Sequence, residues 1–187
     1  MEHKGTKTLE TERLVLRPFT MSDAEAMYTN WANDPEVTEY LSWPTHDNVE
    51  VTKNVLESWV NQYEELGFYH WDITVKEEGD EPIGSISVVG KKESIKSVSM
   101  GYCIGRQWWR KGITSEALAT LIKFFFEEVG INRLVAEHDP ANPGSGKVME
   151  KCGLKYEGTL RSVLLTPRRG LADSAVYAIL ASDYKND

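Results

Sequence analysis

The sequence has little cysteine, less positive than negative charge, and no long apolar run. Its 187 residues include two cysteines, Cys103 and Cys152, which lie far apart without a histidine at ligand spacing, so neither a disulfide scaffold nor a zinc site is expected. The 21 Lys and Arg against 29 Asp and Glu give a net charge of −8, which argues against sequence-independent binding of nucleic acid. No segment approaches the roughly 18 apolar residues that a membrane span requires. We expect a cytoplasmic protein that does not bind membranes.

The length and the apolar content predict one domain over residues 1–187, with residues 1–8 and 184–187 loosely ordered. A capping-box spacing at Ser22 to Glu25 opens the first expected helix, and Gly67 and Gly130 end the second and third. Alternating and helical spacing of apolar residues predicts strands over 12–18, 69–76, 83–89, 98–104, 133–137, 156–164 and 176–180, and helices over 22–31, 49–66, 113–128 and 146–152. This order is typical of an α/β domain with a mixed, mostly antiparallel sheet.

A basic loop at residues 105–112 connects a predicted strand directly to the long third helix. The N–H groups of a helix's first turn lack intrahelical partners and lie at the positive end of the dipole, so this loop favours an anion such as pyrophosphate. Neither the P-loop pattern nor the dinucleotide-binding pattern fits, since Arg110 occupies the second glycine position of the former. The alternative is a solvated connection in which Trp108 and Trp109 serve as packing anchors.

About thirty residues beyond the loop lies the segment 142–154, with Asn142, Ser145 and then Cys152-Gly153-Leu154. Together with segments 11–17, 83–86, 100–104, 116–118 and 177–180, it resembles the GNAT superfamily of acyl-CoA N-acyltransferases, in its Rim-type branch related to ribosomal-protein N-terminal acetyltransferases. The loop departs from the family pattern Gln/Arg-x-x-Gly-x-Gly/Ala, because Arg110 stands where the first glycine belongs. We expect arginine there only with a negative φ, and its guanidinium would then add a contact to phosphate.

The resemblance implies a fold, a donor and a set of binding residues. The sheet would splay between its two middle strands, with about four flanking helices, and the donor would be acetyl-CoA, without a metal. Backbone groups of Tyr102, Cys103 and Ile104 would pair with the pantetheine arm, and one N–H would stabilise the thioester oxygen as it gains charge. The remaining implied contacts to coenzyme A come from Gln107, Trp108, Trp109, Arg110, Lys111, Gly112, Ile113, Thr114, Asn142, Ser145 and Lys147.

The implied chemistry is direct attack of a primary amine on the thioester, which requires the amine to lose its proton. The resemblance places Glu137 as the base, directly or through water, although His138 and Asp139 adjoin it and a rim carboxylate is the alternative. Ser145 would protonate the departing thiolate, or it would cap the short helix that follows. Cys103 has no basic neighbour in sequence to activate it, so we expect it to pack rather than react.

The acceptor side is expected in the first helical region, at Trp31, Asp34, Glu36, Tyr40 and Trp43-Pro44, whose acids would suit a cationic amine; aromatic packing with solvated acids is the alternative. The acceptor would be a protein N-terminus or a small-molecule amine, and the family allows a homodimer. Two other classes stay open at this point. One is a non-catalytic module that binds coenzyme A as a sensor, and the other is a ribosome-associated factor, which the net charge disfavours.

Overall fold

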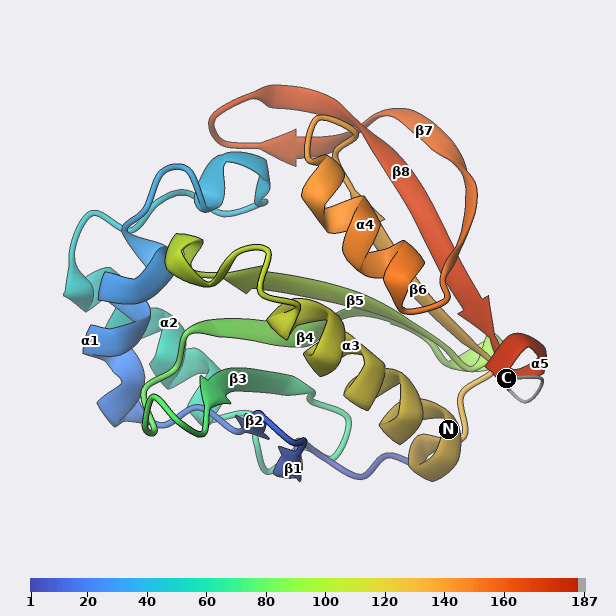
Figure 1. Ribbon diagram of the computed structural model, residues 1–187, viewed down its shortest axis with the longest axis horizontal. Helices are drawn as coiled ribbons and strands as arrows, with labels where there is room; N and C mark the ends of the chain where they lie inside the picture. The colour runs from blue at the N-terminus through green and yellow to red at the C-terminus, as the bar shows by residue number, and fades with distance from the viewer. Residues whose placement is uncertain (185–187) are drawn as a thin grey trace.

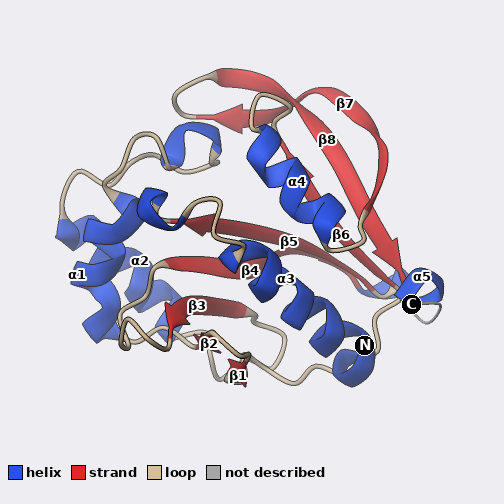
Figure 2. Cartoon of the chain, in the orientation of Figure 1, coloured by secondary structure: helices blue, strands red, loops and turns tan. Residues whose placement is uncertain are grey.

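The computed structural model describes residues 1–184 as a single eight-stranded sheet with helices on both faces (Figures 1 and 2). The strands lie in the order β1-β2-β3-β4-β5-β6-β8-β7, and every neighbouring pair is antiparallel except β5 and β6. The bounds are β1 (Leu9–Glu10), β2 (Leu14–Arg17), β3 (His70–Val75), β4 (Gly84–Lys92), β5 (Ser97–Ile104), β6 (Arg133–His138), β7 (Lys155–Thr166), β8 (Gly170–Leu180), α1 (Ala24–Met27), α2 (Val49–Val60), α3 (Ile113–Phe124), α4 (Pro143–Lys151) and α5 (Ala181–Tyr184). The predicted α/β class and mixed, mostly antiparallel sheet are confirmed.

Helices α2 and α3 cover opposite faces of the sheet, because successive side chains of a strand point to opposite sides. On β3, the ring of His70 lies 3.8 Å from that of Trp59 in α2, whereas the next residue, Trp71, lies 5.8 Å from Phe124 in α3. Each face therefore has its own apolar core, one beneath α3 and one beneath α1 and α2. Helix α4 lies on the same side of the sheet as α3 (Figure 1).

Several helix boundaries differ from the expected ones, and the helix expected to run to residue 128 changes from α to π geometry at Phe125–Val129. The first helical segment starts with a 3₁₀ turn at Met21–Asp23, and Thr20 is its N-cap residue. The Thr20 N–H donates to the Asp23 carboxylate at 2.7 Å. The capping box therefore begins at Thr20, and the expected start at Ser22 is wrong by two residues. Helix α2 ends at Val60, and residues 61–67 form turns that carry the Tyr63 hydroxyl to the His70 carbonyl at 2.8 Å. Helix α4 starts at Pro143, three residues early, because proline suits a first helical turn.

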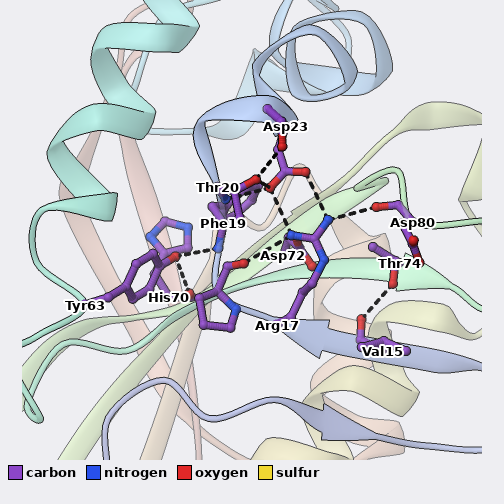
Figure 3. Close-up of polar contacts among 12 residues, drawn as sticks. Val15, Arg17, Phe19, Thr20, Asp23, Tyr63, His70, Asp72, Thr74 and Asp80 are labelled. Atoms are coloured by element: carbon purple, nitrogen blue, oxygen red, sulfur yellow. Dashed lines mark hydrogen bonds and ion pairs between the residues drawn. The ribbon is translucent and has the colours of Figure 1, made fainter.

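A buried charged cluster joins β2, β3 and the first helical turns (Figure 3). Arg17 donates both terminal nitrogens to the Asp23 carboxylate, at 2.9 and 3.0 Å, and its Nη1 lies 2.6 Å from Asp72 Oδ2. Asp72 is fully buried, and burial raises its pKa to about 8 against the opposing effect of Arg17. The cluster fixes the start of α1 to the sheet.

The N-terminus and α5 lie at the same side of the molecule (Figure 1). Residues 1–8, expected to be loosely ordered, lie along the body: the Glu2 N–H donates to the Val129 carbonyl at 2.9 Å and the Lys4 N–H to the Tyr69 hydroxyl at 3.0 Å. Tyr184 ends α5, and the rest of the expected loose C-terminus lies outside the described residues. Within residues 1–184, no helix is both long and apolar enough to span a bilayer.

The sheet opens between β5 and β6, as expected. The two strands pair in parallel only from Ser97 to Met100, opposite Arg133 to Ala136. Beyond that point β5 continues to Ile104 alongside β4, and β6 continues to His138 alongside β8, so the two middle strands diverge (Figure 1). Several of the site residues expected from the sequence line a pocket at this opening.

Candidate active site

The last residues of β5 present a free backbone edge to the opening. Along a strand, the N–H and C=O groups of successive residues point to alternate sides. The Gly105 N–H donates to the Ile83 carbonyl at 2.8 Å and Cys103 pairs with Ser85, so the odd-numbered residues bond to β4. Tyr102 and Ile104 therefore direct their N–H groups toward β6, whereas the backbone of Cys103 faces away from the opening.

The loop before α3 contains two residues in the left-handed backbone region, Arg110 at φ +62° and Gly112 at φ +77°. The expected negative φ at Arg110 is wrong: this arginine adopts a left-handed backbone conformation that favours glycine. Gly112 is the N-cap of α3 and has no side chain that caps the first turn. The N–H groups of that turn are thus available to an anion.

The charges of the loop divide into two groups. Arg106 is neutralised within the protein, because its Nε lies 3.0 Å from Asp34 Oδ2 and its Nη1 contacts the Glu36 carboxylate. None of the ion pairs within residues 1–184 involves Arg110 or Lys111. Among the charges of the loop itself, Arg110 and Lys111 are therefore the ones that no acid of residues 1–184 pairs with, whereas Asp34 and Glu36 are engaged by Arg106.

The two tryptophans of the loop both form hydrogen bonds within the protein. Trp108 is buried and its indole N–H donates to Glu78 Oε2 at 2.7 Å. Trp109 is exposed on one side, and its indole N–H donates to the Ile104 carbonyl at 2.9 Å. These bonds hold the loop against the turn between β3 and β4 and against the end of β5, while Gln107 lies exposed beside them.

A further clamp on the loop was not expected from the sequence. Arg13 Nε donates to Glu116 Oε2 at 2.7 Å, and Arg13 Nη1 donates to the Lys111 carbonyl at 3.2 Å. Although burial opposes it, hydrogen bonds from Thr11 and Arg13 lower the pKa of Glu116. In the sequence Glu116 is only an acid in a first helical turn, and no spacing rule connects it with a residue a hundred positions earlier.

A pocket at the opening brings four of the predicted site residues together, namely Tyr102, Glu137, Asn142 and Ser145. Ser145 Oγ donates to the Tyr102 hydroxyl at 3.0 Å, and that hydroxyl donates to the Ser145 carbonyl at 3.0 Å. Burial raises the pKa of Tyr102, so its hydroxyl stays protonated. Asn142 is the N-cap of α4 and Ser145 lies in the first turn, so the expectation that Ser145 caps the helix is wrong and its hydroxyl is directed to the pocket residue Tyr102.

The three polar residues at the end of β6 have different partners. Glu137 is exposed, accepts a hydrogen bond from Ser174 Oγ at 2.6 Å, and takes part in none of the ion pairs of the described chain. Asp139 is buried and forms an ion pair with Arg169. His138 Nδ1 lies 2.8 Å from the Asp139 carbonyl, and its Nε2 is buried without a partner in residues 1–184. Only Glu137 presents a carboxylate that no cation neutralises.

The other predicted residues occupy less direct positions. Tyr40 lines the pocket with Leu41, and the Arg169 guanidinium lies over the Tyr40 ring, 4.9 Å from its centre. Trp31 is fully buried in the core beneath α1 and α2. Cys103 Sγ lies 3.5 Å from Ser85 Oγ and burial raises its pKa, in keeping with a packing role.

Trp43 packs against His46, with ring centres 5.3 Å apart. Lys147 is exposed on α4 and lines a second cavity together with Gly146 and Tyr177. Residues 1–184 contain no group of three His, Cys, Asp or Glu side chains that could hold a metal ion.

Comparison with known proteins identifies relatives over almost the whole chain. Residues 13–155 match the family described as acetyltransferase (GNAT) domain. The uncharacterized N-acetyltransferase p20 of Bacillus licheniformis is 32% identical over 95% of this chain and 98% of its own. The [ribosomal protein uS5]-alanine N-acetyltransferase of Escherichia coli is 33% identical over 38% of this chain and 37% of its own. The crystal structure of a GNAT-family acetyltransferase from Bacillus anthracis superposes with a TM-score of 0.81 at 26% identity, over 94% of this chain and 99% of that one.

Proposed function

The chain belongs to the GNAT family of acetyltransferases, and we propose that it transfers the acetyl group of acetyl-CoA directly to a primary amine. The observation that carries the proposal is the pocket where β5 and β6 diverge. It combines the free edge of β5, a hydroxyl pair at Ser145 and Tyr102, and the unneutralised carboxylate of Glu137. The uncapped N-terminus of α3 begins only a short loop beyond β5.

The donor site fits a pyrophosphate followed by an extended arm. The first-turn N–H groups of α3 and the unpaired cations Arg110 and Lys111 suit the pyrophosphate. The N–H groups of Tyr102 and Ile104 would pair with the amides of the arm, as in strand addition to a sheet edge. We retain the remaining predicted contacts as part of the proposal: Gln107, Trp108, Trp109, Gly112, Ile113, Thr114, Asn142, Ser145 and Lys147.

Acetyl-CoA supplies an activated acyl group and a thiolate leaving group, and Ser145 is the proposed proton donor to that thiolate. Its hydroxyl lies in a hydrogen-bonded pair with Tyr102 at 3.0 Å. Because the Tyr102 hydroxyl also donates to the Ser145 carbonyl, the two groups fix each other's orientation. General acid catalysis requires this positioning before it requires a particular pKa.

Glu137 is the proposed base that accepts the proton of the attacking amine, directly or through water. An α-amine has a pKa of about 8 and a lysine-like amine about 10.4, so both are mostly cationic at neutral pH. An exposed carboxylate beside the pocket attracts such a cation and receives its proton. Asp139 is a poorer choice because Arg169 already neutralises it.

The acceptor class that we propose is a primary amine, either at a protein N-terminus or on a small molecule. The similarity to a relative that acts on the alanine of ribosomal protein uS5 supports the first. Arg106 neutralises Asp34 and Glu36, so among the acids proposed here for the acceptor, Glu137 is the one available to the amine.

Release of free thiol from acetyl-CoA, measured with a panel of N-terminal peptides, polyamines and amino acids, tests this function. We expect turnover with at least one class of primary amine and none with its N-methylated tertiary counterpart. Tight binding of coenzyme A without turnover on any member of the panel would contradict the enzyme assignment and support a coenzyme A-binding module instead.

A further inference from the structure

The side chain of Ser174 lies directly behind Glu137. Ser174 belongs to β8, whose register places Val176 opposite Glu137 and Ala175 opposite His138. Its side chain is fully buried, whereas Glu137 is exposed, and Ser174 Oγ donates to Glu137 Oε2 at 2.6 Å. A hydroxyl in the interior thus holds one oxygen of a surface carboxylate.

The β7–β8 hairpin contacts two acids at the end of β6, one through a cation and the other through a neutral hydroxyl. At its tip, Arg169 forms an ion pair with buried Asp139, which removes that carboxylate as a proton acceptor. Further along β8, Ser174 contributes a neutral donor to Glu137, which leaves the negative charge in place. A hydroxyl donor orients a carboxylate without supplying a counter-charge.

The strand around Ser174 is itself held in place. Three residues of β7, from Arg161 to Val163, bulge between the pairs Leu160–Ser174 and Leu164–Ala172. Within this bulge Ser162 has a positive φ of 52°, and its N–H donates to Asp173 Oδ1 at 2.9 Å. The residue next to Ser174 is therefore anchored to the neighbouring strand.

We propose that Ser174 is a positioning residue for the base: its hydroxyl fixes Glu137 Oε2 and thereby directs Oε1 to the amine in the pocket. This inference rests on the proposed function, in which Glu137 accepts the amine proton. Without this hydrogen bond the carboxylate rotates freely, and fewer of its orientations direct Oε1 to the amine.

The test is a double-mutant cycle of Ser174→Ala and Glu137→Gln, with kcat/KM measured across a range of pH for one amine. We expect Ser174→Ala to lower kcat/KM for the amine about fivefold across the pH range, with the KM for acetyl-CoA unchanged. In the Glu137→Gln background, the same change at Ser174 should have no further effect.

Two further variants separate positioning from general structural damage. Ser174→Thr keeps the hydroxyl and should restore the wild-type kcat/KM, even if the added methyl lowers the melting temperature. Ser97→Ala removes another buried serine, where β5 and β6 are paired and away from the opening, and should leave kcat/KM unchanged.

The outcomes distinguish the two proposals. If Ser174→Ala keeps the wild-type kcat/KM while Glu137→Gln lowers it and changes the pH profile, the positioning role is refuted and the base stands. If Ser174→Ala lowers kcat/KM equally in both backgrounds, Ser174 does not act through Glu137. If Glu137→Gln itself keeps the wild-type profile, the base assignment fails and the role of Ser174 fails with it.

Discussion

Replacing Arg110 by glycine changes both the backbone strain and the charge of the loop before α3. Arg110 adopts a left-handed conformation at φ +62°. An L-residue there costs about 1 to 2 kcal/mol that glycine does not incur. Glycine also makes the unfolded chain more flexible, and this lowers the stabilisation gained from the lost strain by about 0.5 to 1 kcal/mol. We therefore expect Arg110→Gly to stabilise the fold by about 0.5 to 1 kcal/mol, and to raise Tm by about 1 to 4 °C for a chain of this length.

The same substitution removes a cation that no carboxylate of the described chain neutralises. If the guanidinium contacts the pyrophosphate, the dissociation constant of coenzyme A should rise about three- to tenfold at low salt. The loss should shrink at higher ionic strength, because an exposed charge is screened. Stability and affinity are thus expected to change in opposite directions.

Arg110→Ala is the matched control, since it removes the charge but keeps a Cβ at the left-handed position. Thermal unfolding and calorimetric titration of coenzyme A at about 0.05 and 0.3 M salt measure both effects. We expect Arg110→Gly to melt above Arg110→Ala, with equal losses of affinity. Equal Tm values for the two variants would refute the strain argument. Unchanged affinity in both would refute the phosphate contact.

Three further predictions concern the pocket, the strand behind it and the buried cluster. Ser145→Ala should lower kcat about 100-fold with little change in the affinity for acetyl-CoA, and an unaltered kcat would exclude Ser145 as the acid. Gly84→Ala places a Cβ 2.5 Å from the Cys103 carbonyl oxygen and should destabilise the fold by about 2 kcal/mol. The control is Gly90→Ala on the same strand, whose Cβ meets ordinary contacts at 3.5 Å. Equal melting temperatures of the two variants would contradict the predicted clash. The pKa of Asp72 is raised from 3.8 to about 8, so between these two pH values the folded protein retains a proton that the unfolded chain releases. The free energy of unfolding therefore falls as the pH rises through this range, by up to about 1.4 kcal/mol per pH unit. The Tm of Asp72→Asn relative to that of wild type should therefore rise between about pH 5 and 8. A Tm difference that stays constant over this range would refute the raised pKa of Asp72.

The fold was largely predictable, because its strands and helices carry regular apolar spacing. The strands of the meander and α3 were found for this reason, and family resemblance supplied the opening between β5 and β6. The short strand β1 was missed, since two residues are too few to show alternation. The early end of α2 was missed as well, because the turn that replaces its last residues is stabilised by the long-range bond from Tyr63 to His70.

The site was predictable in its members but not in their pairing. The sequence indicated Ser145, Glu137 and the loop cations, and the pocket brings the first two together. It did not indicate that Arg106 pairs with Asp34, or that Ser174 lies behind Glu137. These contacts join residues that are 72 and 37 positions apart. Local spacing in the sequence cannot predict these contacts, because the residues come together only when the sheet and its loops have folded.

The most direct test of the central proposal is a crystal structure with coenzyme A and a primary amine product. We predict electron density for the pyrophosphate at the first turn of α3 and for the pantetheine arm along Tyr102 and Ile104. The sulfur should lie within hydrogen-bond reach of Ser145 Oγ, and the acceptor nitrogen within reach of Glu137, directly or through one water. Coenzyme A bound outside the opening between β5 and β6, or a sulfur remote from Ser145, would contradict the account.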